Sequence, residues 1–163
     1  MPDTPTHRRP ATVRLRPVTA ADLPALFLQQ LDPDANSMAA THPRSAEAFD
    51  AHWASILANP AVVARAILAD GTLVGQISCF QMHDQHNVGY WIAKPHWNRA
   101  IATHALALLL KEVPTRPLHA QVARHNLASL RVLQRTGFTI TAHRHAPATD
   151  RFPACEEVLL TLT

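Results

Sequence analysis

Two short segments of this sequence carry groups suited to anion binding and proton transfer. The first, residues 94–103, joins an apolar run to a long predicted helix and holds Arg99 just before the helix start. Free backbone N–H groups and the helix dipole favour an anion there, and a guanidinium adds donors suited to phosphate. The second, residues 125–138, starts a helix at Asn126, a capping residue type, with Ser129 one turn further on the same face. Each segment alone also fits ordinary structure, as a solvated helix start or a simple cap.

Taken together and in order, the segments resemble the GNAT superfamily of N-acetyltransferases, most closely its ribosomal-protein-alanine acetyltransferase branch. The residues that carry the resemblance are Gly89-Tyr90-Trp91-Ile92, Trp97-Asn98-Arg99-Ala100-Ile101-Ala102-Thr103, Asn126-x-x-Ser129-x-Arg131-Val132-Leu133 and Gly137-Phe138. It extends over about residues 13–162. The resemblance implies a GNAT fold, acetyl-CoA as cosubstrate and an amine as acceptor.

The resemblance also implies where acetyl-CoA binds. In this family the fourth strand pairs with the pantetheine arm through its backbone, which here means Trp91, Ile92 and Ala93. The loop and helix start that cradle the pyrophosphate correspond to Arg99, Ala100, Ile101, Ala102 and Thr103. Asn126 matches the family's asparagine, an expected pantetheine contact. Ser129 is the candidate catalytic residue, as proton donor to the CoA sulfur.

Several positions depart from the family pattern. Trp97 replaces a polar residue of the phosphate loop, and Ala100 replaces a glycine, so a methyl group can crowd the phosphate unless φ stays negative. Asn87 stands where the branch often has glutamate, and an amide is no base at neutral pH. Leu133 stands where many relatives carry a tyrosine acid. The general base therefore stays open between an ordered water and four side chains: His83, Asp84, Glu156 and Glu157.

Composition narrows the class of protein. A chain of 163 residues that is 47% hydrophobic fits one globular domain. The longest apolar run, 105–110, is far shorter than the roughly 20 residues of a membrane span. The charge of +3 is scattered, so no nucleic-acid partner is expected. Two cysteines and no visible secretory signal favour the cytoplasm, and we expect a monomer or homodimer.

The positions of the histidines and glycines argue against a metal site and against two nucleotide-binding motifs. The pairs His83-x-x-His86 and His143-x-His145 lack a full ligand set with cysteine or acid, so no metal is expected. The chain has four glycines, and their positions fit neither a dinucleotide-binding fingerprint nor a P-loop.

The elements that position these residues follow from the hydrophobic pattern. We expect a flexible tail at 1–11 and one α/β (α+β) domain at 12–163 with a mixed sheet and the order βααβββαβαββ. Strands are expected at 13–17, 62–69, 73–82, 88–93, 118–123, 138–145 and 156–162. Helices are expected from about residue 19 or 22 to 31, at 45–58, 100–113 and 126–136, with a loop at 34–44. Strand–helix–strand units in the second half predict that part of the sheet is parallel.

The sequence thus predicts an acetyl-CoA-dependent N-acetyltransferase that acts on a primary amine, either a protein N-terminus or a small molecule. The departures from the pattern leave an alternative, a non-catalytic GNAT-like module that binds an acyl-CoA or a protein partner. The enzyme is favoured because this fold accepts varied acid and base residues. Nothing in the sequence selects the acceptor.

Overall fold

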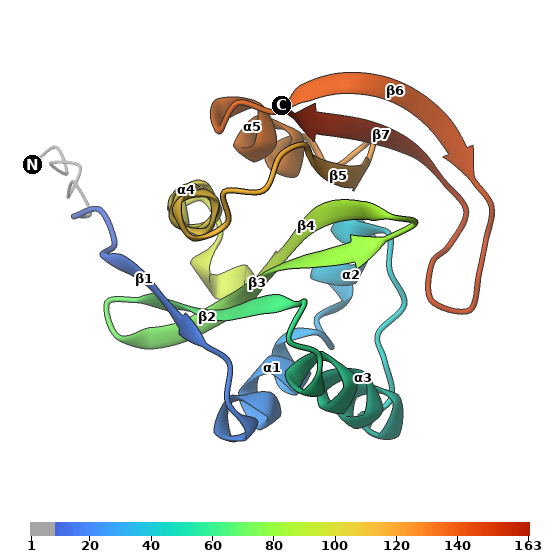
Figure 1. Ribbon diagram of the computed structural model, residues 1–163. Coiled ribbons are helices and arrows are strands. Elements are labelled where there is room, and N and C mark those ends of the chain that lie inside the picture. The colour runs from blue at the N-terminus through green and yellow to red at the C-terminus, as the bar shows by residue number, and fades with distance from the viewer. Residues whose placement is uncertain (1–8) are drawn as a thin grey trace, which may run out of the picture.

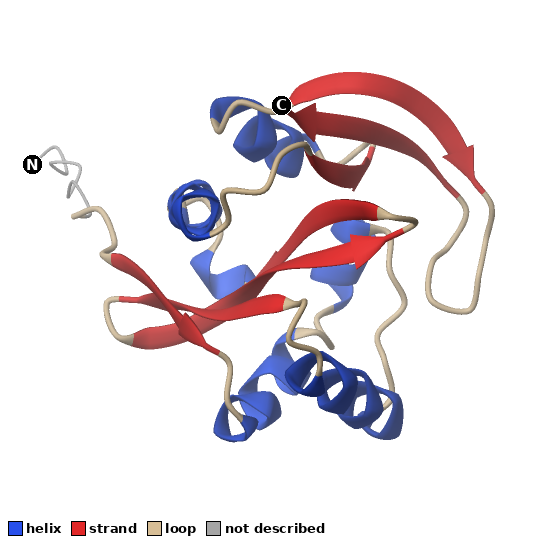
Figure 2. Cartoon of the chain, viewed as in Figure 1, coloured by secondary structure: helices blue, strands red, loops and turns tan. Residues whose placement is uncertain are grey.

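Seven strands form one mixed sheet in the spatial order β1-β2-β3-β4-β5-β7-β6 (Figures 1 and 2). The computed structural model describes residues 9–163. The strands are β1 (Val13–Pro17), β2 (Val63–Ala69), β3 (Thr72–Met82), β4 (Gln85–Ile92), β5 (Leu118–Ala123), β6 (Thr139–Ala146) and β7 (Cys155–Leu162). The helices are α1 (Leu23–Gln29), α2 (Pro33–Ala39), α3 (Ala46–Ala58), α4 (Ile101–Glu112) and α5 (Leu127–Arg135). Two short 3-10 helices, Ala20–Asp22 and Lys94–His96, precede α1 and α4. The predicted mixed α/β class is confirmed.

Helix α2 corrects the prediction of a loop at 34–44. Asp32, interpreted as the end of the preceding helix, instead caps a new one: its Oδ1 accepts a hydrogen bond from the Ala35 N–H at 2.9 Å. Pro33 occupies the first helical turn, where its missing N–H costs nothing. The same residue types that stop one helix start the next, so the order gains a third helix before β2.

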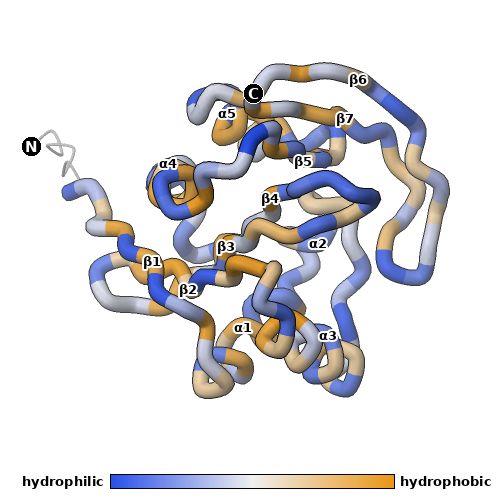
Figure 3. The backbone as a smooth tube through the Cα atoms, viewed as in Figure 1, coloured by the Kyte–Doolittle hydropathy of each residue, from blue (hydrophilic) through white to orange (hydrophobic). Residues whose placement is uncertain are grey.

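The two faces of the sheet are covered by different helices. Alternate residues of β2 point to opposite sides, so Ala64 and Ala66 pack with α1 and α3 while Ile67 and Ala69 pack with α4 and α5. Buried residues of α4 and of the inner strands belong to one core. In Figure 3 the outer strand β6 is mostly polar. Burial of apolar surface between the sheet and the helices on its two faces is the main contribution to the stability of the fold.

The second half contains the predicted parallel pairing, but only once. Strands β4 and β5, connected through α4, pair in parallel. Strand β6 does not add beside β5, because β7 lies between them and pairs antiparallel with both. The last strand of the chain, β7, therefore takes an inner position in the sheet, and β6 forms the exposed edge.

The N-terminal tail predicted at 1–11 falls mostly outside the described residues. Of its last three residues, Ala11 is 8% exposed and belongs to the main core. The next residue, Thr12, donates its N–H to Asp70 Oδ1 at 2.9 Å. Within residues 9–163, no helix is long and apolar enough to cross a membrane.

Candidate active site

A wedge between two strands forms the centre of the site. Strands β4 and β5 are paired at one position, Asn87 with His119, and β5 makes no further pairing with the rest of β4. The other edge of β4 stays paired with β3 up to Gly75 and Ile92. Gly75 permits this close approach, because a Cβ there would lie 2.0 Å from the Trp91 carbonyl oxygen. One edge of the β4 backbone beyond Asn87 is therefore open to a ligand.

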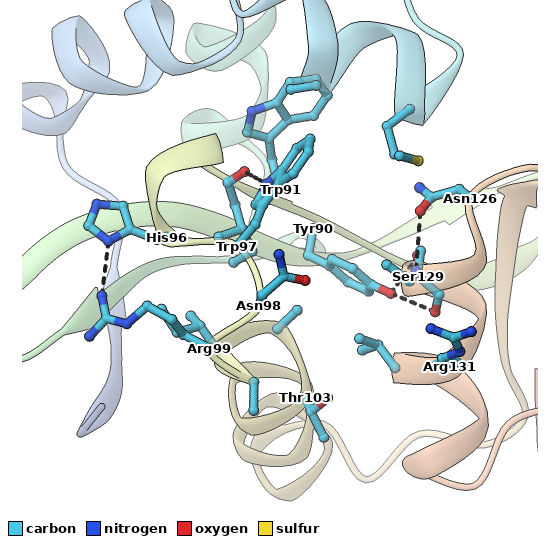
Figure 4. Close-up of a pocket in the computed structure, with 18 of the residues that line it drawn as sticks. Tyr90, Trp91, His96, Trp97, Asn98, Arg99, Thr103, Asn126, Ser129 and Arg131 are labelled. Atoms are coloured by element: carbon cyan, nitrogen blue, oxygen red, sulfur yellow. Dashed lines mark hydrogen bonds between the residues drawn. The ribbon is translucent and has the colours of Figure 1, made fainter. Parts of the chain in front are cut away.

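A cavity of about 310 Å³ lies on the β4 side of this wedge (Figure 4). Its walls come from the end of β4, the turn into α4, one side of α2 and the first turns of α5. The predicted site residues that line it are Trp91, Ile92, Arg99, Ala100, Ile101, Ala102, Thr103, Asn126 and Ser129. Ala93 is not among them: its N–H donates to the Val74 carbonyl at 2.8 Å, which turns it into the sheet. The structure thus brings together residues that lie 38 positions apart in the chain, from Trp91 to Ser129.

The start of α4 has a backbone geometry that the sequence prediction did not anticipate. Ala100 has φ of 57° and Asn98 has φ of 61°, so both are left-handed. The condition that φ at Ala100 stays negative is therefore not met. The chain must turn sharply between the 3-10 helix and α4, and glycine makes such a turn without steric cost whereas alanine does not. The first helical bond runs from the His104 N–H to the Ala100 carbonyl, and the N–H groups of 101–103 have no partner within the helix.

Two hydroxyl groups meet on the α5 side of the cavity. The Tyr90 hydroxyl lies 2.7 Å from Ser129 Oγ and 3.3 Å from the Ser129 carbonyl oxygen (Figure 4). Burial raises the pKa of Tyr90 to about 12, so its phenol keeps its proton at neutral pH. Asn126 Oδ1 accepts the Ser129 N–H at 3.2 Å, which fixes this turn as predicted. Both hydroxyls are therefore held as neutral donors beside the wedge.

Sequence reasoning missed Tyr90 as a functional candidate. It is the one tyrosine of the chain, and it stands in the Gly89-Tyr90-Trp91 run that carries the family resemblance. This run was therefore the signal that pointed to Tyr90, whereas Leu133, where many relatives carry tyrosine, gave none. Leu133 is 1% exposed and belongs to the core, so it has no contact with the cavity.

The arginines around the cavity differ in their partners. Arg99 Nη2 lies 3.4 Å from Asp70 Oδ2, and Arg99 Nη1 lies 3.2 Å from His96 Nδ1. Its guanidinium is therefore drawn toward the β2–β3 turn. Two further cations line the cavity from α5, Arg131 and Arg135. Their spacing of four residues places them on one face of the helix, a signal that was present in the sequence.

Trp97 has a structural role that its departure from the family pattern did not suggest. Its indole N–H donates to the Ile92 carbonyl at 2.8 Å, which closes the end of β4. Trp91 similarly donates its indole N–H to the Gln29 carbonyl at 3.3 Å, beside α1. These bonds fix the wall of the cavity, and the Ile92 carbonyl already has a partner within the protein.

Comparison with known proteins decides the family. Residues 12–139 match the model of the acetyltransferase (GNAT) domain. The chain belongs to the GNAT acetyltransferase family. No curated protein sequence matches it.

Solved GNAT structures are similar in fold. The spermidine N-acetyltransferase from Vibrio cholerae, solved with CoA and spermine, has a TM-score of 0.79 at 13% identity, over 92% of this chain and 94% of that one. RimJ from Mycobacterium smegmatis, solved with CoA-disulfide, has 0.76 at 23%, over 93% and 81%. RimL, a ribosomal L7/L12 alpha-N-protein acetyltransferase, has 0.77 at 18%, over 92% and 89%. At such identities the likeness concerns the fold.

The four candidate bases of this GNAT chain lie in different places. His83 and Asp84 form the exposed β3–β4 turn and line neither of the cavities described here. Glu157 is paired with Arg144, whose Nε lies 2.8 Å from its Oε2. Glu156 lines a second cavity. Asn87 is 3% exposed, and its amide donates to the Gln85 carbonyl at 3.1 Å.

The second cavity of the GNAT chain, about 650 Å³, lies on the other side of α2. Ala35, Met38 and Ala39 of that helix face the first cavity. The lining of the second comes from α2, the β5–α5 turn and the segment before β7: Asn36, Ser37, Ala40, Thr41, Arg124, His125, Pro153, Ala154, Cys155 and Glu156. The His125 side chain holds the turn against α2, with Nε2 2.9 Å from the Ser37 carbonyl oxygen. In the described part of the chain, no group of three His, Cys, Asp or Glu side chains is placed to hold a metal ion.

Proposed function

We propose that this protein transfers an acetyl group from acetyl-CoA to a primary amine. The observation that carries the proposal is the wedge beyond Asn87, where the open β4 backbone, the free N–H groups of α4 and two neutral hydroxyls line one cavity. Membership of the GNAT acetyltransferase family supports the same reaction. The acceptor, a protein N-terminus or a small amine, is not selected by these features.

The chemical groups that line the cavity suit the successive parts of acetyl-CoA. The N–H groups of 101–103 and the positive end of the α4 dipole suit a pyrophosphate. Arg99, Arg131 and Arg135 add charge of the matching sign. The open edge of β4 offers backbone donors and acceptors to the amide groups of a pantetheine arm. The one feature that opposes the fit is the Ala100 methyl group, which lies in the turn where a phosphate would approach.

Acetyl-CoA supplies an activated acetyl thioester. Transfer forms a C–N bond and breaks a C–S bond, and the leaving sulfur needs a proton. Ser129 is the proposed donor of that proton, and Tyr90, within 2.7 Å, positions its hydroxyl and can restore the proton. A backbone N–H of β4 polarises the carbonyl, and an ordered water takes the proton of the amine.

Two measurements, made one after the other, test this function. Calorimetry with acetyl-CoA tests binding, and release of free thiol in the presence of a panel of amines and N-terminal peptides tests transfer. Binding together with amine-dependent thiol release supports the transferase. Binding with no thiol release for any amine favours the alternative, a non-catalytic acyl-CoA-binding module. Absence of binding at millimolar acetyl-CoA contradicts both.

A further inference from the structure

Two loops far apart in the sequence are joined beside α3. The loop between α2 and α3 and the loop between β6 and β7 run side by side at one edge of the molecule (Figure 1). The His42 N–H donates to the Arg151 carbonyl at 2.8 Å, and Arg151 Nη1 donates back to the His42 carbonyl. This reciprocal pair fixes Arg151 against the first loop.

Arg44, on the same loop, is fixed through its backbone. Its N–H donates to Gln30 Oε1 at 2.8 Å, and its carbonyl accepts from Gln30 Nε2 at 3.0 Å. Its side chain makes no hydrogen bond or ion pair with any described residue. The half-buried guanidinium is thus held in place by its main chain, with its donors free.

Arg44 and Arg151, which we call the cluster because the His42 contacts bring their two loops together, lack a carboxylate counter-ion among the described residues. Within residues 9–163, neither pairs with a carboxylate, including Glu47 and Asp150, the nearest in the chain. Arg151 Nε is buried and has no acceptor. Burial lowers the pKa of Arg151 to about 10, and repulsion from Arg44 adds to the effect. The pKa of His52, on α3, falls to about 4 through burial and repulsion from both arginines.

Such an arrangement costs free energy in the absence of an anion. Two like charges that are partly removed from water repel one another, and a buried N–H without an acceptor carries a desolvation cost. A carboxylate bound by Arg44 and by the outer end of Arg151 would offset the repulsion between the two charges, and the planar guanidinium suits it.

Arg44 and Arg151 do not themselves line the second cavity, but residues close to each of them in the chain do. Thr41, three residues before Arg44, and Pro153, two residues after Arg151, both line it. The cavity wall also carries Arg124, and its one carboxylate is Glu156, whose Oε1 lies 2.7 Å from His145 Nδ1. The β5–α5 turn is shared, because Arg124 lines this cavity while Asn126 lines the first. An acceptor bound here would lie on the opposite side of α2 from the α4 start.

We propose that Arg44 and Arg151 form an anion site that binds a carboxylate of the acceptor, so that the preferred substrate is an amine carrying an acidic group. The inference rests on the proposed transferase function and names its substrate class. A polycationic amine is the opposite charge type, and we expect it to be disfavoured at this cluster.

Matched probes test the charge preference by binding and by turnover. The full-length protein, saturated with CoA, is titrated with the peptides Ser-Glu-Glu-Ala-amide and Ser-Gln-Gln-Ala-amide, which differ in charge but hardly in shape. We expect the acidic peptide to bind about tenfold more tightly or better, the scale of one charge-assisted hydrogen bond. Acetylation of the same peptides, of glutamate and glutamine, and of spermidine is measured in parallel. A preference for glutamate over the acidic peptide identifies a small amino acid as the carboxylate source.

Substitutions of single arginines test whether the preference for the acidic peptide arises at Arg44. Arg44→Gln should abolish most of the discrimination, and Arg44→Lys should keep part of it, because the charge remains. Arg44 makes its hydrogen bonds to Gln30 through the backbone, so both variants should fold. Arg14→Gln, an exposed β1 position at the other side of the sheet, removes the same charge and should leave the discrimination unchanged.

Each outcome decides one of the two proposals. Tighter binding of the acidic peptide, lost in Arg44→Gln, supports the anion site even if no acetylation occurs, in which case the transferase proposal fails. Equal affinity, binding of neither peptide at millimolar concentration, or a preference for spermidine overturns the anion site and leaves the transferase proposal to its own test.

Discussion

The two cavities on either side of α2 are built in different ways. The first is made of a strand end, a helix start, one side of α2 and the first turns of α5, and it combines backbone N–H groups with hydroxyls and three arginine side chains. The second is bordered by loops that are more than 100 residues apart in the chain, and its polar groups are side chains. A backbone-built site suits a ligand that all members of a family share. A site built from loop side chains can change from one member to the next without disturbing the fold.

Charge compensation differs among the arginines of the two regions. Arg131 and Arg135, at the first cavity, have no carboxylate partner among the described residues. Arg99, at the first cavity, has Asp70 as a partner at 3.4 Å. Arg44 and Arg151, beside the second, have no carboxylate partner among the described residues. A guanidinium that is already paired binds an added anion less strongly, whereas an unpaired one is ready for it. The following variants test whether this division between the two regions holds, beginning with the largest expected effect.

Loss of the Ser129 hydroxyl should have the largest effect on turnover. Ser129→Ala is expected to lower kcat about 100-fold, the scale of general acid catalysis, with acetyl-CoA affinity almost unchanged. The cap on α5 uses the Ser129 backbone N–H, so the helix start should persist. Tyr90→Phe, which removes only the neighbouring hydroxyl, is expected to cost about tenfold. Steady-state kinetics and calorimetry on the same preparations separate the two effects, and turnover within a few-fold of wild type would remove Ser129 from the mechanism.

Arg99→Ala should weaken acetyl-CoA binding by about 1–3 kcal/mol, the range for a charge-assisted hydrogen bond. We expect the lower end, because Asp70 already compensates part of the charge of Arg99. Calorimetry at two salt concentrations checks the assignment, since screening should reduce the difference between variant and wild type. An unchanged affinity would assign phosphate binding to Arg131 and Arg135 instead.

Ala100→Gly should stabilise the fold by about 0.5–1 kcal/mol, because glycine accepts the left-handed conformation that alanine occupies at a cost. If the methyl group also crowds the phosphate, acetyl-CoA binds more tightly. Ala102→Gly is the matched control: it lies within the first turn of α4, where glycine should cost about 1 kcal/mol. Denaturant unfolding measures stability, and calorimetry measures affinity. Loss of stability in both variants would contradict the left-handed turn.

His52 should contribute a small pH dependence to stability. Its pKa is lowered from 6.5 to about 4 in the folded protein, so the unfolded chain takes up the proton more readily. The free energy of unfolding should therefore fall as pH drops from about 6.5 to about 4, by about 1 kcal/mol once solvent screening is considered. The difference between wild type and His52→Asn isolates this contribution from that of the carboxylates. A difference that does not vary across this window would show that neither burial nor the arginines lower the pKa of His52 in the folded protein.

The elements could be predicted wherever the local pattern had one structural solution. The strands predicted at 62–69 and 73–82 form β2 and β3 on either side of the Asp70-Gly71 turn, and the helix predicted from residue 45 is α3, which Ser45 caps. Helix α2 was missed because Asp32-Pro33 is compatible both with the end of a helix and with the start of one. Choosing between them requires the packing of the following turn, which a local pattern does not contain.

The sequence alone determined the family resemblance, the mixed sheet and the contiguous segments of the first cavity, because each follows from short local patterns and from their order along the chain. The tertiary structure decided the rest. It gave Ala100 a positive φ, because the turn into α4 is dictated by the sheet and helix on either side. It brought Tyr90 within 2.7 Å of Ser129. It also joined Arg151 to His42, a contact between residues 109 positions apart. Such contacts depend on the closing of the whole sheet, and no spacing along the chain encodes them.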